Sequence, residues 1–210
     1  MTDTRPDPAP AADGPSPGDA PYIDATRSWL VRAVIGLNLC PFAKGVHVKN
    51  QVRYVVSPAR SPAELQADLA RELDWLAQAD PEVVDTTLLI HPHVLQDFLD
   101  FNDFLEVVDD TVADGGHEGV LQVASFHPEY QFGDASADDI ENYTNRSPFP
   151  TLHLIREASI DRAVEAFPDA EMIYEVNMAT MRRLGLDGWQ RLWRSDAGGD
   201  EPTAGQGTSN

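Results

Sequence analysis

Two histidine–proline pairs each close a strand-like apolar run, and these histidines are well suited to chemistry. His91-Pro92 ends the run 85–91, and His127-Pro128 ends the run 120–126. Histidine titrates near neutral pH, which makes it the most frequent general acid or base in proteins. We predict that His127 is the general acid or base of a site and that His91 assists it. The alternative is that both pairs only terminate strands, since proline suits strand ends.

The loop 127–150 is the second indication of a site. It spans roughly 24 residues without hydrophobic periodicity, and loops of that length in compact domains are usually functional or disordered. Arg146, its only basic residue, is suited to clamp a carboxylate or a phosphate. We predict that Asn145 and Arg146 hold the substrate, with Tyr130 as a further ligand contact. The alternative is that Arg146 pairs with an acidic residue of the loop.

His153 and Cys40 are further candidates for ligand contacts. Strand alternation in 151–156 puts His153 and Ile155 on one face, and a buried core histidine is the alternative to a site residue there. Cys40 precedes Pro41, but Ala43 stands where a dithiol redox motif needs its second cysteine. A structural cysteine and a reactive thiol both stay open.

Familiar cofactor signatures are missing from the sequence. It contains no phosphate loop, dinucleotide glycine fingerprint, nucleophile elbow or zinc-protease motif, so it indicates no particular cofactor. A metal site would have to combine His91, His93, His127 and an acid such as Glu129. Pro92 between the first two histidines makes that arrangement strained.

Composition excludes several classes of partner and location. The formal net charge of −20 over 210 residues repels nucleic acid phosphates and anionic lipids, so we expect neither partner. No apolar run approaches the roughly 18 residues of a membrane span, and the N-terminus lacks the pattern of a signal peptide. With Cys40 as the only cysteine, these features indicate a bacterial-type cytoplasmic protein. They say nothing about oligomeric state.

Hydrophobic periodicity and end signals predict the order of elements. Ser61 and Glu64 form a capping box that opens a helix, and Gly185 is expected to stop the last helix. Arg156 next to Glu157 suggests an ion pair on the surface. We predict helices at 23–39, 97–113, 159–167 and 169–184, and a further helix that begins at 61 and extends beyond 76. We predict strands at 51–57, 85–91, 120–126 and 151–156.

This alternation predicts a single α/β domain over residues 22–194, with a four-stranded, largely parallel or mixed sheet packed by helices. An α+β sandwich is the alternative. We expect the tails 1–21 and 195–210, rich in small and polar residues, to be disordered. Ligand sites form beyond the C-terminal ends of parallel strands, so His91 and His127 are expected at one edge of the sheet. Their strand ends would be about 5 Å apart as neighbours, or about 10 Å with one strand between them.

Three sequence blocks carry a resemblance to a known family. They are 39–43 (LCPFA), 125–132 (SFHPEYQF) and 142–157 (NYTNRSPFPTLHLIRE). The chain resembles a bacterial family known as domain of unknown function 1415 over roughly residues 22–185. The resemblance implies that five candidate residues belong to family motifs, and it implies no activity. These residues are Cys40, His127, Asn145, Arg146 and His153.

Three functional hypotheses follow from the sequence. The leading one is a small soluble enzyme that uses histidine acid–base chemistry on an anionic small molecule. The second is a non-catalytic binding or adaptor module in which the histidine, tyrosine and arginine residues only lock the loop to the sheet. The third is a histidine-based metal-binding protein.

Overall fold

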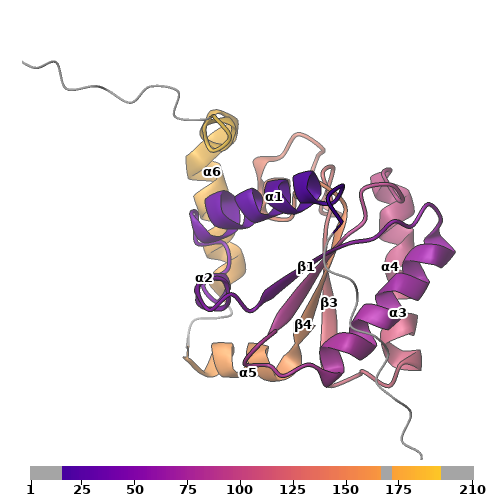
Figure 1. Cartoon of the computed structure of the whole chain (residues 1–210). Coiled ribbons are helices and arrows are strands. Elements are labelled where there is room, and N and C mark those ends of the chain that lie inside the picture. The colour runs from indigo at the N-terminus through magenta and orange to yellow at the C-terminus, as the bar shows by residue number, and fades with distance from the viewer. Residues whose placement is uncertain (1–15, 167–171, 195–210) are drawn as a thin grey trace, which may run out of the picture.

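The computed structural model describes residues 16–166 and 172–194 and shows an α/β fold (Figure 1). The predicted tail segments 1–15 and 195–210 and the predicted helix start at Asp169 lie outside these residues. The elements are α1 (Ala20–Trp29), the π-helix η1 (Leu30–Ile35), α2 (Ala43–Val48), β1 (Val52–Val56), α3 (Pro62–Gln78), β2 (Thr86–Ile90), α4 (Phe98–Asp114), β3 (Leu121–Phe126), the 3-10 helix η2 (Ile140–Thr144), β4 (Thr151–Arg156), α5 (Glu157–Ala166) and α6 (Ile173–Arg191).

The strands form a mixed sheet in the order β1-β2-β4-β3. β1 and β2 are parallel, whereas β4 is antiparallel to both of its neighbours. Only the β1–β2 pair is therefore parallel, because β4 enters the sheet from the long loop 127–150 instead of from a crossover helix. β2 and β3 nevertheless run in the same direction on either side of β4. Their C-terminal ends lie at one edge, as we predicted, with one strand between them.

Helices cover both faces of the sheet. α3 and α4 lie on one face and α1, α2 and α6 on the other (Figure 1). Alternation along β4 separates the two faces, since Leu152 and Leu154 belong to the core under α3 and α4, while His153 and Ile155 point to the opposite side. The second core, under α1 and α6, is built around Trp29, Met181 and Trp189.

The capping box predicted for α3 is confirmed. Ser61 Oγ accepts a hydrogen bond from the Glu64 backbone N–H at 3.3 Å, and the Glu64 carboxylate accepts one from the Ser61 N–H at 3.2 Å. These reciprocal bonds satisfy amide groups that a helix start otherwise leaves unpaired. The strands also lie within one residue of the predicted boundaries at each end.

The predicted end of the first helix is wrong. The helical run widens into η1 and ends at Ile35, because Asn38 adopts a left-handed backbone with φ 56°. A short helix that we did not predict, α2, follows Pro41. Cys40 therefore lies in a connection between two helical segments. The first helix also begins at Ala20, three residues before the predicted start at Ile23.

Three expectations at the C-terminal side need correction. Gly185 does break helical geometry, with φ 62° and ψ 174°, but the chain resumes the helix and α6 continues to Arg191. Arg156 is not a surface residue, since it is only 9% exposed. α5 begins at Glu157 and not at the predicted Ser159, whose hydroxyl donates to Asp85 Oδ1 at 2.6 Å.

Candidate functional site

His91 and His127 lie together on the face of the sheet that α4 covers. Both are fully buried, and their rings stack on Phe101 with centroid distances of 5.6 and 5.1 Å. The strand-end geometry therefore brings the two predicted catalytic histidines around one phenylalanine. Neither ring lines the cavity or the groove described below.

Both nitrogens of His127 have partners inside the protein. Nδ1 accepts a hydrogen bond from the Glu129 backbone N–H at 3.0 Å, so Nε2 carries the proton of the neutral ring and donates to the Leu95 carbonyl at 3.2 Å. Burial lowers the pKa of His127 below its ordinary value, which favours this neutral form. This environment supports a structural role, and the catalytic role of His127 stays a prediction.

His91 fixes the same connection between β2 and α4. Its Nδ1 pairs with the Val94 carbonyl at 3.1 Å, whereas the buried Nε2 has no hydrogen-bond partner. Burial lowers the pKa of His91 to about 4. Because Val94 and Leu95 are consecutive, the two histidines hold adjacent carbonyls. Leu95 has a left-handed backbone with φ 55°, which is strained for a bulky residue.

Internal bonds also hold the predicted substrate clamp in place. Arg146 donates from Nε to the Tyr130 carbonyl at 3.2 Å and from Nη2 to the Ala137 carbonyl at 2.8 Å, and its guanidinium stacks 4.3 Å from the Tyr143 ring centre. Asn145 donates to the Ser125 carbonyl at 3.4 Å. Tyr130 packs its ring against Phe98 and Phe132. These contacts fasten the loop 127–150 to the body.

Arg146 also borders an aromatic groove of about 480 Å³. Tyr143, Trp189 and Trp193 form its aromatic side, with successive ring centroids 5.2 and 5.5 Å apart. Trp29 and Ser147 contribute to the wall. Among the described residues of this lining, Arg146 is the only charged one.

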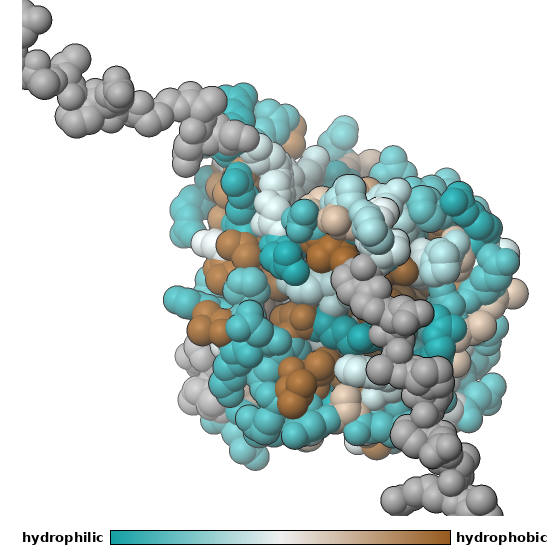
Figure 2. Space-filling view, in the orientation of Figure 1, coloured by the Kyte–Doolittle hydropathy of each residue, from teal (hydrophilic) through white to brown (hydrophobic). Residues whose placement is uncertain are grey.

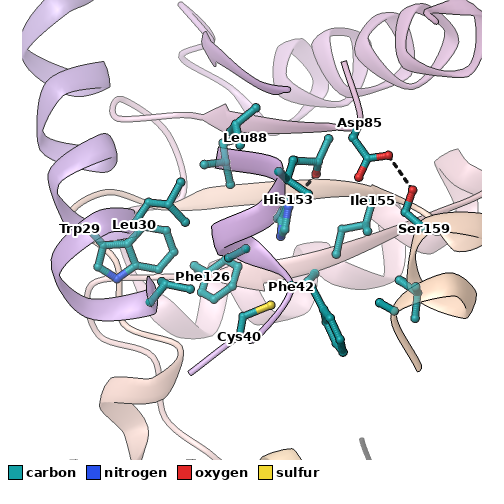
Figure 3. A pocket seen from close by; sticks show the side chains of 18 residues that line it. Trp29, Leu30, Cys40, Phe42, Asp85, Leu88, Phe126, His153, Ile155 and Ser159 are labelled. Atoms are coloured by element: carbon teal, nitrogen blue, oxygen red, sulfur yellow. Dashed lines mark hydrogen bonds between the residues drawn. The ribbon is translucent and has the colours of Figure 1, made fainter. Parts of the chain in front are cut away.

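A separate cavity of about 320 Å³ lies on the opposite face of the sheet from the two strand-end histidines. Figure 3 shows its side chains, which come from all four strands and from helices on both sides of the Cys40 connection. In Figure 2, apolar residues reach the surface in the area between α2 and α5. The lining includes Trp29, Leu30, Val34, Cys40, Asp85, Thr86, Ala124, Phe126, His153, Ile155 and Ser159.

The hydrogen bonds of His153 determine which ring nitrogen is free. The Thr86 hydroxyl donates its single proton to the Leu154 carbonyl at 2.6 Å. It must therefore accept from His153 Nε2, which lies 2.7 Å from it. Nδ1 is then the unprotonated nitrogen, and it has no hydrogen-bond partner among the residues that the structure describes. Burial lowers the pKa of His153 to about 4, so the ring is neutral at pH 7.

Cys40 and His153 both line this cavity although they are far apart in the sequence. Figure 3 shows the Cys40 sulfur and the His153 ring directed into the same space. Cys40 is a half-buried free thiol. Among the described residues, no lysine or arginine lines the cavity, and the one carboxylate there, Asp85, accepts from Ser159 and lies 3.6 Å from Arg162. The cavity is therefore apolar apart from a few hydrogen-bonding groups, as small-molecule sites commonly are.

Sequence reasoning missed Thr86, the residue that orients His153. Its alternation with Leu88 in β2 could have placed both on one face, but the pairing of β2 with β4 was not readable from local pattern. It also missed Ala124 and the short helix α2. Ala124 lies opposite His153 in the β3–β4 register, and its small side chain leaves room for the cavity.

Comparison with protein families assigns the chain. A family described as Protein of unknown function (DUF1415) matches residues 21–191. The chain belongs to this family. The match includes every candidate site residue, and the resemblance seen in the sequence is thereby confirmed at the level of the family. Searches of curated proteins and of solved structures find no match.

The described residues provide neither a cluster of metal ligands nor a membrane-spanning helix. Among residues 16–166 and 172–194, no group of three or more histidine, cysteine, aspartate or glutamate side chains is placed to hold a metal ion. In the same part of the chain, no helix combines the length and apolar character needed to cross a membrane.

Proposed function

We propose that this protein binds a small, uncharged and mostly apolar molecule in the cavity lined by Cys40 and His153. The observation that carries the proposal is the unprotonated Nδ1 of His153, which faces an otherwise apolar space. A ligand that donates a hydrogen bond to this acceptor gains both affinity and orientation, because the rest of the cavity wall is mostly apolar. The apolar walls supply the remaining affinity.

The same geometry supports an enzyme that uses histidine as a base. Nδ1 carries the free lone pair of the neutral ring, so it is the nitrogen that can accept a proton from a bound hydroxyl or thiol. Thr86 fixes the tautomer and the orientation of the ring through its bond to Nε2. This proposal moves the acid–base role from the strand-end histidines to His153, where a ligand has room to bind.

Charge defines the ligand class. An ionised carboxylate or ammonium group placed in this cavity would lose hydration without gaining an opposite charge from the lining, apart from the already paired Asp85. We therefore expect neutral ligands to be preferred over charged ligands of the same length.

Calorimetric titration with 1-hexanol, hexanoate and hexylamine tests the proposal. We expect 1-hexanol to bind at least about tenfold more tightly than either charged homologue, because burying an unpaired charge is costly. Ala124→Phe should abolish hexanol binding by filling the cavity. Gln122→Phe is the matched control, since Gln122 lies two residues earlier on the same strand face but is exposed and outside the lining. Equal binding of hexanoate, or retained binding in Ala124→Phe, would refute the proposal.

The aromatic groove supports a second candidate function, the binding of an anionic aromatic molecule. Arg146 supplies a positive charge in an acidic protein, and three aromatic rings in edge-to-face contact lie beside it. Benzoate should bind there and quench the fluorescence of Trp189 and Trp193, whereas benzyl alcohol should not. Arg146→Gln should weaken benzoate binding, and an unchanged affinity in this variant would exclude the site.

A further inference from the structure

We propose that Cys40 and His153 form a thiol–imidazole pair that accepts an acyl group from a small, neutral acyl donor. This inference rests on the proposed function, because the donor has to enter the same cavity. It adds a covalent step and assigns Cys40 as the nucleophile.

The first argument is the arrangement of the two groups. The thiol comes from the connection before α2 and the imidazole from the middle of β4, and both are directed into one cavity (Figure 3). Apart from its contact with the cavity, the His153 ring is enclosed by protein, and its Nε2 is occupied by Thr86. Nδ1 is consequently the nitrogen able to take a proton from a group in the cavity.

The second argument concerns which reagents can reach the pair. Leu30, Val34 and Phe126 line the same space and offer an apolar surface to an acyl chain. The lining residues that the structure describes include no lysine or arginine, so they offer no counter-ion to a carboxylate or phosphate on the donor. The substrate class is therefore an uncharged ester or thioester with a short hydrocarbon chain.

The proposed step is an acyl transfer to sulfur. The Cys40 sulfur forms a bond to the carbonyl carbon of the donor, and the bond from that carbon to its leaving oxygen or sulfur breaks. His153 Nδ1 takes the thiol proton and delivers it to the leaving group. The products are S-acyl-Cys40 and the protonated leaving group, so no oxidant or further reactant is needed.

The test uses 4-nitrophenyl butyrate as the neutral donor and mono-4-nitrophenyl succinate as an anionic donor of similar length. Release of 4-nitrophenol and the gain of one butyryl group in the intact mass report the step. We expect stoichiometric acylation of the wild-type chain, none at this position in Cys40→Ala, and at least about tenfold slower reaction with the anionic ester. Equal acylation of Cys40→Ala, or equal rates for the two esters, would overturn the proposal.

His153→Gln tests the base separately from the fold. Glutamine retains an N–H that can donate to Thr86 but has no proton acceptor of comparable basicity. We expect acylation to slow by about 100-fold, which is within the usual contribution of general base catalysis. We also expect the wild-type chain to be acylated faster than this variant at every pH down to 6. An unchanged rate in folded His153→Gln would overturn the role of the imidazole.

Hexanol titration of Cys40→Ala separates this inference from the proposed function. Removing the thiol should leave hexanol binding within about twofold, since the alanine leaves the cavity open and Nδ1 in place. If hexanol binds but no acyl group transfers, the covalent step alone fails. If hexanol does not bind the wild-type chain, the proposed function fails as well.

Discussion

At the scale of single residues, the two strand-end histidines act on the backbone that follows them. Each ring holds a carbonyl of the connection between β2 and α4, and the connection includes the left-handed Leu95. Holding a bulky residue in that conformation costs about 1–3 kcal/mol, which the surrounding contacts must offset. The neutral, buried rings and their stacking on Phe101 provide such contacts.

This arrangement predicts a large loss of stability in His127→Ala. The change removes a buried ring and leaves the Glu129 N–H and the Leu95 carbonyl without partners. We expect the free energy of unfolding to fall by about 3 kcal/mol, measured by urea denaturation. His93→Ala is the control, because the half-buried His93 makes an edge contact with Tyr22, and it should cost less than about 1 kcal/mol. A His127→Ala variant as stable as the wild type would favour the predicted catalytic role instead.

Residue types in the sequence drew attention to His127 and His153 but could not distinguish their surroundings. His127 and His153 both follow or interrupt apolar strands, and only the tertiary partners distinguish a ring with two bonded nitrogens from one with a free nitrogen. Cys40 was ambiguous for a similar reason. Strand pairing and the unpredicted helix α2 place Cys40 and His153 in the lining of one cavity, and neither feature leaves a local signal in the sequence.

At the scale of elements, Arg156 joins the end of β4 to the end of α3. Its Nη2 donates to the Leu76, Ala79 and Val84 carbonyls at 2.6, 2.8 and 3.3 Å. The last carbonyls of a helix have no partner within it, so a buried cation there satisfies them and also complements the helix dipole. A single side chain thus fixes how α3 ends against the sheet.

Replacing Arg156 should therefore loosen the packing of α3 on the sheet. We expect Arg156→Ala to lower the free energy of unfolding by about 3 kcal/mol, since buried carbonyls lose charged donors. Arg156→Lys should recover part of this loss because an ammonium group can still reach some of the carbonyls. Arg162→Ala is the control, as its side chain is largely exposed and should cost less than about 1 kcal/mol. Equal losses in Arg156→Ala and Arg162→Ala would contradict the role of Arg156.

Elements with strong local signals were predictable, and those fixed by long-range contacts were not. The α3 capping box and the alternation of the strands depend only on residues that are close together in the sequence. The π-helix η1 and the short α2 depend on packing against α6 and the sheet, so periodicity alone misplaced the end of the first helix. The position of β4 between β2 and β3 likewise follows from the path of the loop 127–150.

At the scale of the whole molecule, the sheet separates two environments that each bury histidine. His91 and His127 lie under α4, and His153 lies on the opposite face. The sequence predicted one site at one edge of the sheet, whereas the structure distributes the candidate residues over a sealed cluster, an open groove and a cavity. The only site among these that joins a free base to a thiol is the cavity.

Buried neutral histidines on both faces predict that folding weakens in mild acid. Burial lowers the pKa of His91 and of His153 to about 4, while an unfolded histidine titrates near 6.5. Between these values the unfolded chain binds more protons than the folded one, so stability is full above pH 6.5 and falls as the pH drops toward 4. At pH 5 each of the two histidines should cost about 2 kcal/mol.

Urea unfolding at pH 7.5, 6.5, 5.5 and 5.0 measures this effect, with the double variant His91→Gln/His153→Gln as the comparison. Carboxylates titrate in both proteins, so the difference between their pH profiles isolates the two imidazoles. We expect the double variant to be less stable than the wild type at pH 7.5 but to lose about 4 kcal/mol less on going to pH 5. Parallel profiles would mean that burial lowers the pKa of neither ring.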